Sequence, residues 1–251
     1  MKLVKVKHPD AMSIEAAAEF MCAIQSYNPV KLGLATGGTP VGFYDKLVRM
    51  KEAEDISLTH VHTFNLDEYV GLHAEDVNSY HFYMKKHLFQ YTNIPVQQRH
   101  LPDGKAIDLE AECERYEALI EQEGPIDLQL LGLGNNGHIG FNEPGTPFSS
   151  RTHIVNLDKS TREANARYFA SLAEVPEQAI TMGLQTIMEA KAIFLLVAGE
   201  EKAKPLYQLL YGDVTEDFPA SILHRHPHVT VIADEKACQF IPEDLNKVVV
   251  R

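Results

Sequence analysis

The sequence predicts an α/β fold: a doubly wound, mostly parallel sheet with helices on both faces, Rossmann-like in outline. Short apolar runs alternate with longer segments of helical periodicity along the chain, which is typical of parallel strands joined by crossover helices. The length of 251 residues suits one large domain of this kind. Because no repeat, low-complexity tract or linker interrupts the pattern, we predict a single domain over residues 1–251.

Each predicted element follows from local periodicity. The first apolar run alternates with lysines, which favours a strand at the edge of the sheet. The candidate strands are Leu3–Val6, Lys31–Ala35, His60–Leu66, Leu128–Leu133, Ala192–Ala198 and Val229–Ala233. The candidate helices between them, where apolar and charged residues recur at helical spacing, include Met12–Ser26, Pro40–Glu54, Ser79–Phe89 and Leu109–Gln122.

Net charge excludes some partners. The formal charge is -12, so the chain repels nucleic acids and anionic lipid surfaces, and we expect neither as a partner. A small anionic substrate remains compatible, because backbone N–H groups and a few local cations suffice to hold a phosphate. No apolar run approaches the ~18 residues that span a bilayer, and the first residues lack a signal-peptide core, so we expect a cytoplasmic protein.

The loop after the second candidate strand reads Ala35-Thr36-Gly37-Gly38-Thr39-Pro40. Its paired glycines allow the backbone to approach an anion closely, its threonines donate hydrogen bonds, and the following helix offers unpaired N–H groups. The alternative is a tight strand-to-helix turn without a ligand. We interpret Thr36, Gly37, Gly38 and Thr39 as a candidate phosphate cradle.

Two adjacent carboxylates, Asp67 and Glu68, follow the third candidate strand. Ligands of open parallel sheets bind beyond the carboxyl ends of the strands, so a carboxylate here is a candidate general base. Because neighbours on an extended chain point to opposite faces, we expect only one of the two, Asp67, to face the site. The alternative for Asp67 is a helix cap.

The loop after the fourth candidate strand contains Gly134-Asn135-Asn136-Gly137-His138, with Glu143 five residues further on. Histidine titrates near neutrality and passes a proton in either direction, and a nearby carboxylate fixes its tautomer and raises its basicity. A lone histidine is more often structural. Its place in a glycine-rich loop at the end of a strand favours a functional role for His138.

Scattered cations complete the candidate site. Arg162, Arg167 and Lys202 are each ordinary surface charges when taken alone, but together they supply the cations that a phosphate site in an acidic protein needs. The turn-rich and then polar segment of residues 142–167 is a candidate lid. The alternate histidines in His224–His228 lack a carboxylate or cysteine to complete a ligand set, so we expect no metal site.

Three motifs closely resemble the glucosamine-6-phosphate deaminase family, in order and at similar spacing. They are Thr36-Gly37-Gly38-Thr39-Pro40, then Phe64-Asn65-Leu66-Asp67-Glu68-Tyr69-Val70-Gly71-Leu72, then Gly137-His138-Ile139-Gly140-Phe141-Asn142-Glu143-Pro144. The resemblance covers nearly the whole chain. It implies an amino-sugar phosphate isomerase and deaminase, classed as a hydrolase, that works without a cofactor on glucosamine 6-phosphate.

The resemblance also implies roles for residues. Asp67 would take the C2 proton of the opened sugar and return it to C1. His138 would open the ring, with Glu143 orienting and charging it. Thr36 to Thr39, Arg167 and Lys202 match positions that hold the phosphate in that family.

Two departures from the family pattern matter. Asn136 stands where some members have an aspartate, so it can hydrogen-bond but adds no negative charge, and His138 should depend more heavily on Glu143. His153 and Val155 stand where better-studied hexameric members have cations of an allosteric site. This difference argues against allosteric activation and favours a monomer or small homo-oligomer.

Two other functions compete with deamination. A 6-phosphogluconolactonase-like ester hydrolase resembles the fold and shares a Gly-His loop, but its loop usually continues with Ser-Leu-Phe-Pro, where this chain has Gly140–Pro144. A non-catalytic sugar-phosphate sensor would need a DNA-binding module, for which the chain has neither the room nor the charge. Binding alone also does not require Asp67, His138 and Glu143 together.

Overall fold

The main sheet of the protein is entirely parallel. The computed structural model describes residues 1–242 and 248–250. Within these residues, eight strands follow the order β11-β1-β10-β9-β6-β2-β3-β5. They are β1 (Lys2–Val6), β2 (Val30–Leu34), β3 (Val61–Asn65), β5 (Arg99–His100), β6 (Leu128–Gly132), β9 (Ala192–Val197), β10 (Val229–Asp234) and β11 (Val248–Val250). The predicted α/β class and parallel sheet are confirmed.

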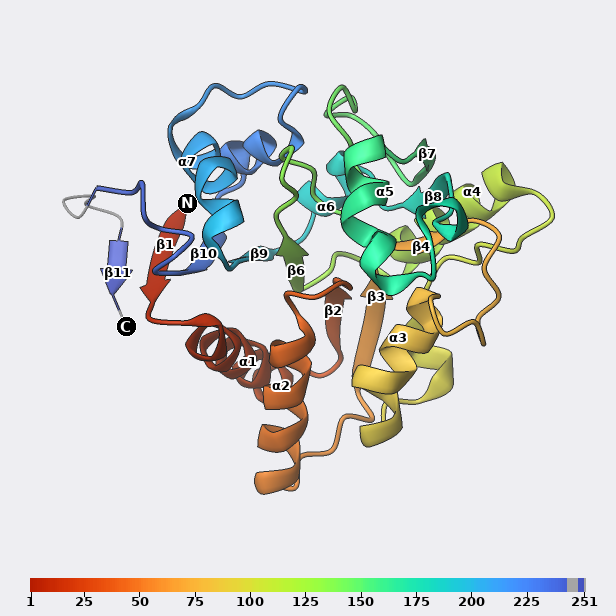
Figure 1. Cartoon of the computed structure of the whole chain (residues 1–251). Coiled ribbons are helices and arrows are strands. Elements are labelled where there is room, and N and C mark those ends of the chain that lie inside the picture. Colours follow the sequence, from red (N-terminus) through yellow and green to blue (C-terminus); the bar gives the residue numbers. More distant parts are fainter. Residues whose placement is uncertain (243–247, 251) are drawn as a thin grey trace.

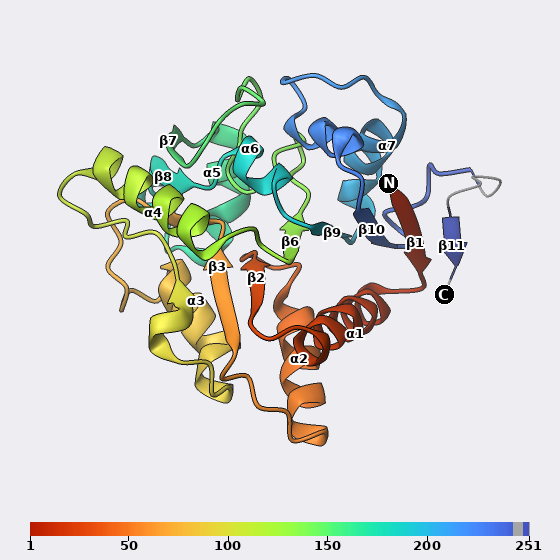
Figure 2. The same cartoon turned by 180° about the vertical axis from the view of Figure 1, so that it is seen from behind.

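Helices cover both faces of this sheet. Figures 1 and 2 show α1 and α2 packed together on one side and α6 and α7 on the other. The α-helices are α1 (Pro9–Ser26), α2 (Val41–Ala53), α3 (Tyr80–His87), α4 (Leu109–Glu123), α5 (Lys159–Asn165), α6 (Leu184–Met188) and α7 (Ala203–Tyr211). The 3-10 helices are η1 (Phe89–Tyr91), η2 (Val96–Gln98), η3 (Ala166–Tyr168), η4 (Leu172–Glu174), η5 (Glu200–Lys202) and η6 (Pro219–Arg225).

Local sequence explains where several helices begin. Ser79 caps α3 by accepting a hydrogen bond from the backbone N–H of Phe82 at 3.0 Å, and Asp108 caps α4 through the N–H of Ala111 at 3.0 Å. Short polar side chains at this position satisfy N–H groups that the first helical turn leaves unpaired. None of the helices in the described residues is long and apolar enough to cross a membrane.

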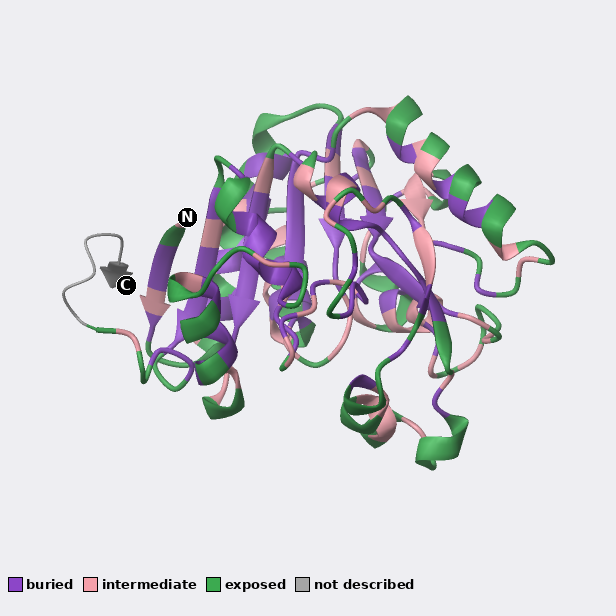
Figure 3. Ribbon diagram, turned by 90° about the horizontal axis from the view of Figure 1, so that it is seen from above, coloured by how far each residue is buried: buried purple, intermediate pink, exposed green. Residues whose placement is uncertain are grey.

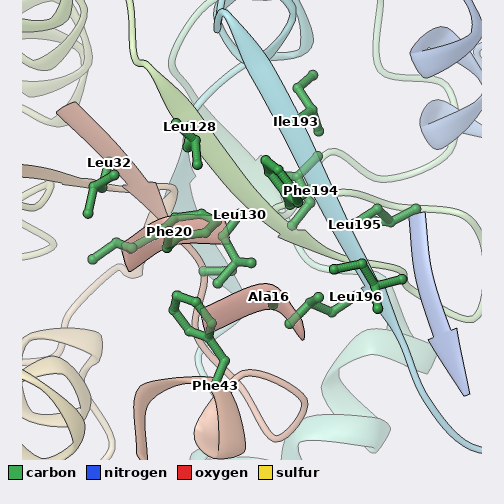
Figure 4. Close-up of a cluster of buried hydrophobic side chains, with 14 of the residues drawn as sticks. Ala16, Phe20, Leu32, Phe43, Leu128, Leu130, Ile193, Phe194, Leu195 and Leu196 are labelled. Carbon is green, nitrogen blue, oxygen red and sulfur yellow. The ribbon is translucent and has the colours of Figure 1, made fainter. Parts of the chain in front are cut away.

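The hydrophobic core lies between the main sheet and its helices. Figure 3 shows the central strands buried, and Figure 4 shows side chains of α1, α2, β6 and β9 meeting in one cluster. The Phe20 ring packs edge-on against Phe43 at 5.0 Å and against Phe194 at 5.7 Å between ring centroids. Aromatic pairs in this geometry add stabilisation beyond their buried area. The core therefore holds the central strands as a rigid base for the loops at their ends.

The predicted edge position of the first strand is wrong. β1 pairs with β10 on one side and with β11 on the other, both in parallel register. The strand-forming segment Val248–Val250 follows more than 240 residues after β1, so the lysine pattern of β1 alone contains no sign of this neighbour.

A second, antiparallel sheet was not predicted. It has the order β4-β8-β7, with strands β4 (Asp67–Tyr69), β8 (Gln178–Thr181) and β7 (His153–Asn156). The chain passes from the main sheet to this small sheet at Leu66, whose N–H donates to Leu34 O at 3.2 Å and whose carbonyl accepts from Met182 N at 2.6 Å. Asp67 therefore begins a strand of the small sheet instead of ending a strand of the main sheet.

The three loops singled out in the sequence, and a fourth loop that leads to Lys202, follow neighbouring strands. They leave the carboxyl ends of β9, β6, β2 and β3, which lie side by side in that order. From β2 the chain continues to β3, whereas from β6 it continues to β9 in the opposite direction. Such a reversal of direction opens a crevice at the strand ends, where ligands of open α/β sheets bind.

Candidate active site

The crevice contains a cavity of about 210 Å³. It collects residues from all four loops and from α5 and η3. Nine of the predicted site residues line it: Thr36, Gly37, Gly38, Thr39, Asp67, Asn136, His138, Arg167 and Lys202. Glu143 lies behind His138, with its Oε2 atom 3.5 Å from the imidazole Nδ1. The structure thus brings together residues that are up to 166 positions apart in the sequence, Thr36 and Lys202 being the most distant.

The loop between β2 and α2 forms the candidate phosphate cradle. Gly37 has a φ of +92°, a conformation that only glycine adopts without strain. Two tyrosine hydroxyls fix the loop from behind: the half-buried Tyr83 donates to Gly37 O at 2.7 Å, and the buried Tyr44 donates to Ala35 O at 2.6 Å. A Cβ at Gly38 would lie 3.3 Å from a guanidinium nitrogen of Arg167, so the missing side chain leaves room for that cation.

Two cations face the cradle. Lys202 donates from Nζ to Asn135 Oδ1 at 2.7 Å, which aims the ammonium group at the cavity. Burial lowers the pKa of Lys202, the charge of Glu201 opposes this, and the charge of Arg167 lowers the pKa further. The two cations are therefore close enough to repel each other, and an anion between them would relieve that repulsion. Asn135 was not among the predicted residues, although it stands in the same glycine-rich loop as His138.

Arg162 does not belong to this site. Its guanidinium donates to Val175 O at 3.0 Å and lies 3.4 Å from Glu177 Oε1, so it fastens α5 to the chain that leads into β8. The interpretation of Arg162 as a phosphate cation is wrong. Arg167, which lies five residues later on η3, lines the cavity instead.

Asp67 and Glu68 point in different directions, as the alternation along a strand requires. Asp67 is 5% exposed and lines the cavity. Glu68 is 1% exposed and accepts hydrogen bonds from the N–H groups of Tyr80 and His81, both at 3.0 Å, at the start of α3. The pKa of Asp67 is raised well above its usual value, first by burial and then by the negative charge of Glu68. A carboxylate with a raised pKa is a stronger base.

His138 is held by its own loop. A Cβ at Gly134 would lie 2.4 Å from Cγ of the imidazole, so the ring packs directly on the glycine backbone. The loop is closed by hydrogen bonds from Gly134 N to His138 O at 2.9 Å and from Gly137 N to Gly134 O at 3.1 Å. The tight turn thus fixes both the backbone and the ring of His138.

Glu143 is kept ionised behind the histidine. Burial alone would raise its pKa, but hydrogen bonding and the charge of His138 outweigh burial, and the pKa of Glu143 is lowered. An ionised Glu143 stabilises a protonated His138. Asn136 donates from Nδ2 to Glu143 Oε2 at 2.8 Å and to Asp158 Oδ2 at 3.3 Å, and it accepts from the N–H of His138 at 3.2 Å. Asn136 therefore bridges the pair without contacting the ring nitrogen.

The candidate lid of residues 142–167 divides into two parts. Asn142 is buried and donates to Ile139 O and Met182 O, both at 2.9 Å, and β7 is paired within the small sheet. Only α5 and η3 line the cavity, through Ser160, Thr161, Ala164, Asn165 and Arg167. The predicted lid therefore remains a prediction for α5 and η3 alone, and the rest of residues 142–167 belongs to the body of the protein.

The histidines of residues 224–228 are engaged in structural contacts. His226 uses both ring nitrogens, Nε2 with Ala190 O at 2.8 Å and Nδ1 with His228 N at 3.1 Å. Within residues 1–242 and 248–250, no group of three or more His, Cys, Asp or Glu side chains is placed to hold a metal ion.

Comparison with known proteins gives a consistent result. Residues 7–232 match the family model described as glucosamine-6-phosphate isomerases/6-phosphogluconolactonase. The glucosamine-6-phosphate deaminase of Shouchella clausii is 57% identical over 237 residues, which cover 94% of this chain and 96% of the relative. Glucosamine-6-phosphate deaminase 1 of Bacillus subtilis is 50% identical over 242 residues, covering 96% and 100% of the two chains.

Solved structures extend the comparison. A structure described as a monomeric glucosamine-6-phosphate deaminase is 50% identical, with a TM-score of 0.94 over 95% of this chain and 99% of its own. The 6-phosphogluconolactonase of Thermotoga maritima has a TM-score of 0.74 over 93% and 99% of the two chains. Its sequence is 21% identical, so this likeness concerns the fold alone.

Proposed function

The chain belongs to the family of glucosamine-6-phosphate isomerases and 6-phosphogluconolactonases, and on that premise we propose that it is a deaminase of glucosamine 6-phosphate. The products are fructose 6-phosphate and ammonia. The observation that carries the proposal is the cavity lined by the carboxylate Asp67, by His138 with Glu143 behind it, and by the two cations. A carboxylate base, an acid/base histidine and a phosphate cradle are the groups that this reaction requires.

Binding begins at the phosphate. The cradle of residues 36–39 offers backbone N–H groups and hydroxyls, and Arg167 and Lys202 offer positive charge. Anchoring this end fixes the position of the reacting carbons, so the binding energy of a remote group is used to orient the sugar.

Ring opening is assigned to His138. The imidazole moves the C1 hydroxyl proton to the ring oxygen, which breaks the C1–O5 bond and leaves an aldehyde at C1. Glu143 stabilises the imidazolium that forms during this transfer, because its carboxylate is ionised and lies 3.5 Å from Nδ1. Asn136 keeps Glu143 in this position.

Asp67 carries out the isomerisation. Its carboxylate removes the C2 proton, the C2–H electron pair forms the C1–C2 double bond of an enolamine, and the aldehyde oxygen takes a proton from water. The same carboxyl then returns its proton to C1, which leaves an iminium at C2, and the iminium nitrogen gives one proton back to solvent to form the imine. The raised pKa of Asp67 favours the first step, because it makes the carboxylate a stronger base.

Release of ammonia is a hydrolysis. One water adds to C2 of the imine, the C2–N bond breaks, and a C2 ketone remains. The net change is therefore aldose-to-ketose isomerisation coupled to hydrolytic loss of the amino group, with no oxidant, reductant or cofactor consumed. We propose that the protein acts as a monomer, since the relative solved at 50% identity is described as monomeric.

The alternative is ester hydrolysis of 6-phosphogluconolactone, an activity named for other members of the family. Lactone hydrolysis needs no base for a C–H proton. The buried Asp67 has no role in it, and burying a carboxyl group that has no hydrogen-bond donor within the described residues costs free energy, so its burial would be unexplained. This observation favours deamination.

The test is ammonia release from glucosamine 6-phosphate, without added metal or cofactor, by the wild-type chain and by Asp67→Asn. We expect rapid release by the wild type and a loss of about 10³-fold or more in the variant with substrate binding retained, because a positioned general base contributes roughly 10² to 10⁴-fold. Lactone hydrolysis without ammonia release would establish the alternative. Full activity of Asp67→Asn would eliminate Asp67 as the base.

A further inference from the structure

Glu68 is a buried acid that the mechanism above leaves unused. Its Oε1 atom accepts from Tyr69 N at 2.8 Å and Tyr80 N at 3.0 Å, and its Oε2 atom accepts from His81 N at 3.0 Å and His81 Nδ1 at 2.9 Å. Four donors on a side chain that is 1% exposed make this one of the most completely bonded groups in the described chain. Hydrogen bonds to the ionised form keep a carboxylate charged even when it is buried.

Asp67, the next residue along β4, has the opposite environment. Within the described residues no hydrogen-bond donor reaches its carboxylate, and no cation is among the groups that perturb it. The titratable groups that face it from the packed elements are the hydroxyls of Tyr44, Tyr69, Tyr80 and Tyr116, together with Glu68. Burial raises the pKa of each of these tyrosines, so they stay neutral. Among these neighbours of Asp67, Glu68 is the group that contributes a negative charge.

We propose that Glu68 is a positioning residue for the reaction, whose buried, ionised carboxylate fastens β4 to the start of α3 and places a negative charge beside Asp67. This inference rests on the proposed role of Asp67 as the base at C2. The pairing of Asp67 with Thr181 and of Glu68 with Ile180 sets both carboxylates in a fixed register of the small sheet. The distance between the two charges therefore does not depend on any mobile segment.

The consequence is a stronger base. Removing a proton from carbon is difficult, and the rate rises with the basicity of the group that takes it. Since the negative charge of Glu68 opposes ionisation of Asp67, it holds the pKa of Asp67 higher than burial alone would. All four hydrogen bonds of Glu68 come from N–H donors of residues 69, 80 and 81, whereas Asp67 faces the cavity, so the two acids have different roles.

The first test compares Glu68→Gln with Glu68→Asp in the full-length protein. Gln removes the charge, whereas Asp keeps it and shortens the side chain. For Glu68→Gln we expect the acid limb of the kcat–pH profile to move to lower pH by about one unit, because the variant removes a neighbouring like charge. We also expect kcat to fall about three- to tenfold with KM little changed. For Glu68→Asp we expect lower thermal stability and an acid limb at the wild-type pH.

A second variant covers the case in which Glu68→Gln does not fold. His81→Arg sets a permanent cation against Glu68 at a position that is only partly buried, and it leaves the backbone donors in place. The acid limb should again move down, by a smaller amount. The control is Ser79→Ala, which removes the cap of the same helix without changing any charge. It should lower Tm and leave the acid limb unmoved.

The outcomes separate this inference from the proposed function. An unmoved acid limb in both Glu68→Gln and His81→Arg, with Asp67→Asn inactive, would overturn the role of Glu68 and leave the base in place. A limb that shifts equally in Ser79→Ala would also overturn it, because the effect would then be structural. An active Asp67→Asn variant would instead defeat the proposed function itself. Ionisation of the substrate is common to all variants and cancels in the comparison.

Discussion

Adding one methyl group at Gly134 should disable His138 without unfolding the protein. The Cβ of Gly134→Ala would lie 2.4 Å from the imidazole Cγ and 2.5 Å from Cδ2 and Cε1. Ordinary contact begins at 3.4 Å, so the ring must retreat by about 1.0 Å, the difference between 3.4 and 2.4. A misplacement of 1 Å costs roughly 10²-fold in rate, which corresponds to about 2.7 kcal/mol in the activation barrier.

The assay is ammonia release from glucosamine 6-phosphate at saturating substrate, with Tm measured in parallel. Gly132→Ala is the matched control for added bulk, because Gly132 lines the same cavity and a Cβ there meets no protein atom within 4 Å. We expect kcat to fall about 10²-fold in Gly134→Ala and less than threefold in Gly132→Ala. Activity of Gly134→Ala within threefold of wild type would refute the argument that the glycine places the ring.

Three further predictions follow from the same geometry. Lys202→Gln should raise KM about 10- to 100-fold with kcat little changed, since it removes a charged hydrogen bond to the phosphate, whereas Lys204→Gln on the exposed face of α7 should leave KM unaltered. Asp67→Asn should raise Tm at pH 8, and this gain should vanish near pH 4. The pKa of Asp67 is higher in the folded than in the unfolded protein, so the carboxyl group lowers stability only when the pH exceeds its unfolded pKa. A gain in Tm that persists at pH 4 would contradict this reasoning. Light scattering should give a mass near 28.1 kDa, the mass of one chain, and a multiple of it would exclude the monomer.

Much of the main sheet could be predicted from sequence, and the small sheet could not. Buried parallel strands are continuous apolar runs, so β6 and β9 are visible without any knowledge of their partners. β4 has only three residues, two of them acidic, and its partner β8 lies more than a hundred residues away. Nothing local distinguishes such a strand from a loop, and its pairing arises only from tertiary packing.

The site shows the same division. Asp67 and His138 follow strands of the main sheet whose ends are visible in the sequence. The choice between Arg162 and Arg167 is not, because the two cations lie on one short polar segment and only the course of η3 decides which of them reaches the cavity. The contact of Gly134 with the His138 ring is equally hidden, since it depends on the closure of the loop on itself.

The chain passes from the main sheet to the small sheet at Leu66, so the candidate site residues belong to two different sheets. The phosphate cradle and the His138 loop are extensions of the main sheet, whereas Asp67 belongs to the small sheet, which also carries the strand that leads into α5. In the proposed mechanism a bound sugar phosphate therefore connects the two sheets, because loops of the main sheet hold its phosphate and Asp67 of the small sheet removes its C2 proton. We therefore expect the amide hydrogens of the β4–β8 pair to exchange more slowly when the substrate is bound. Opening the small sheet would then also break the contacts between Asp67 and the substrate.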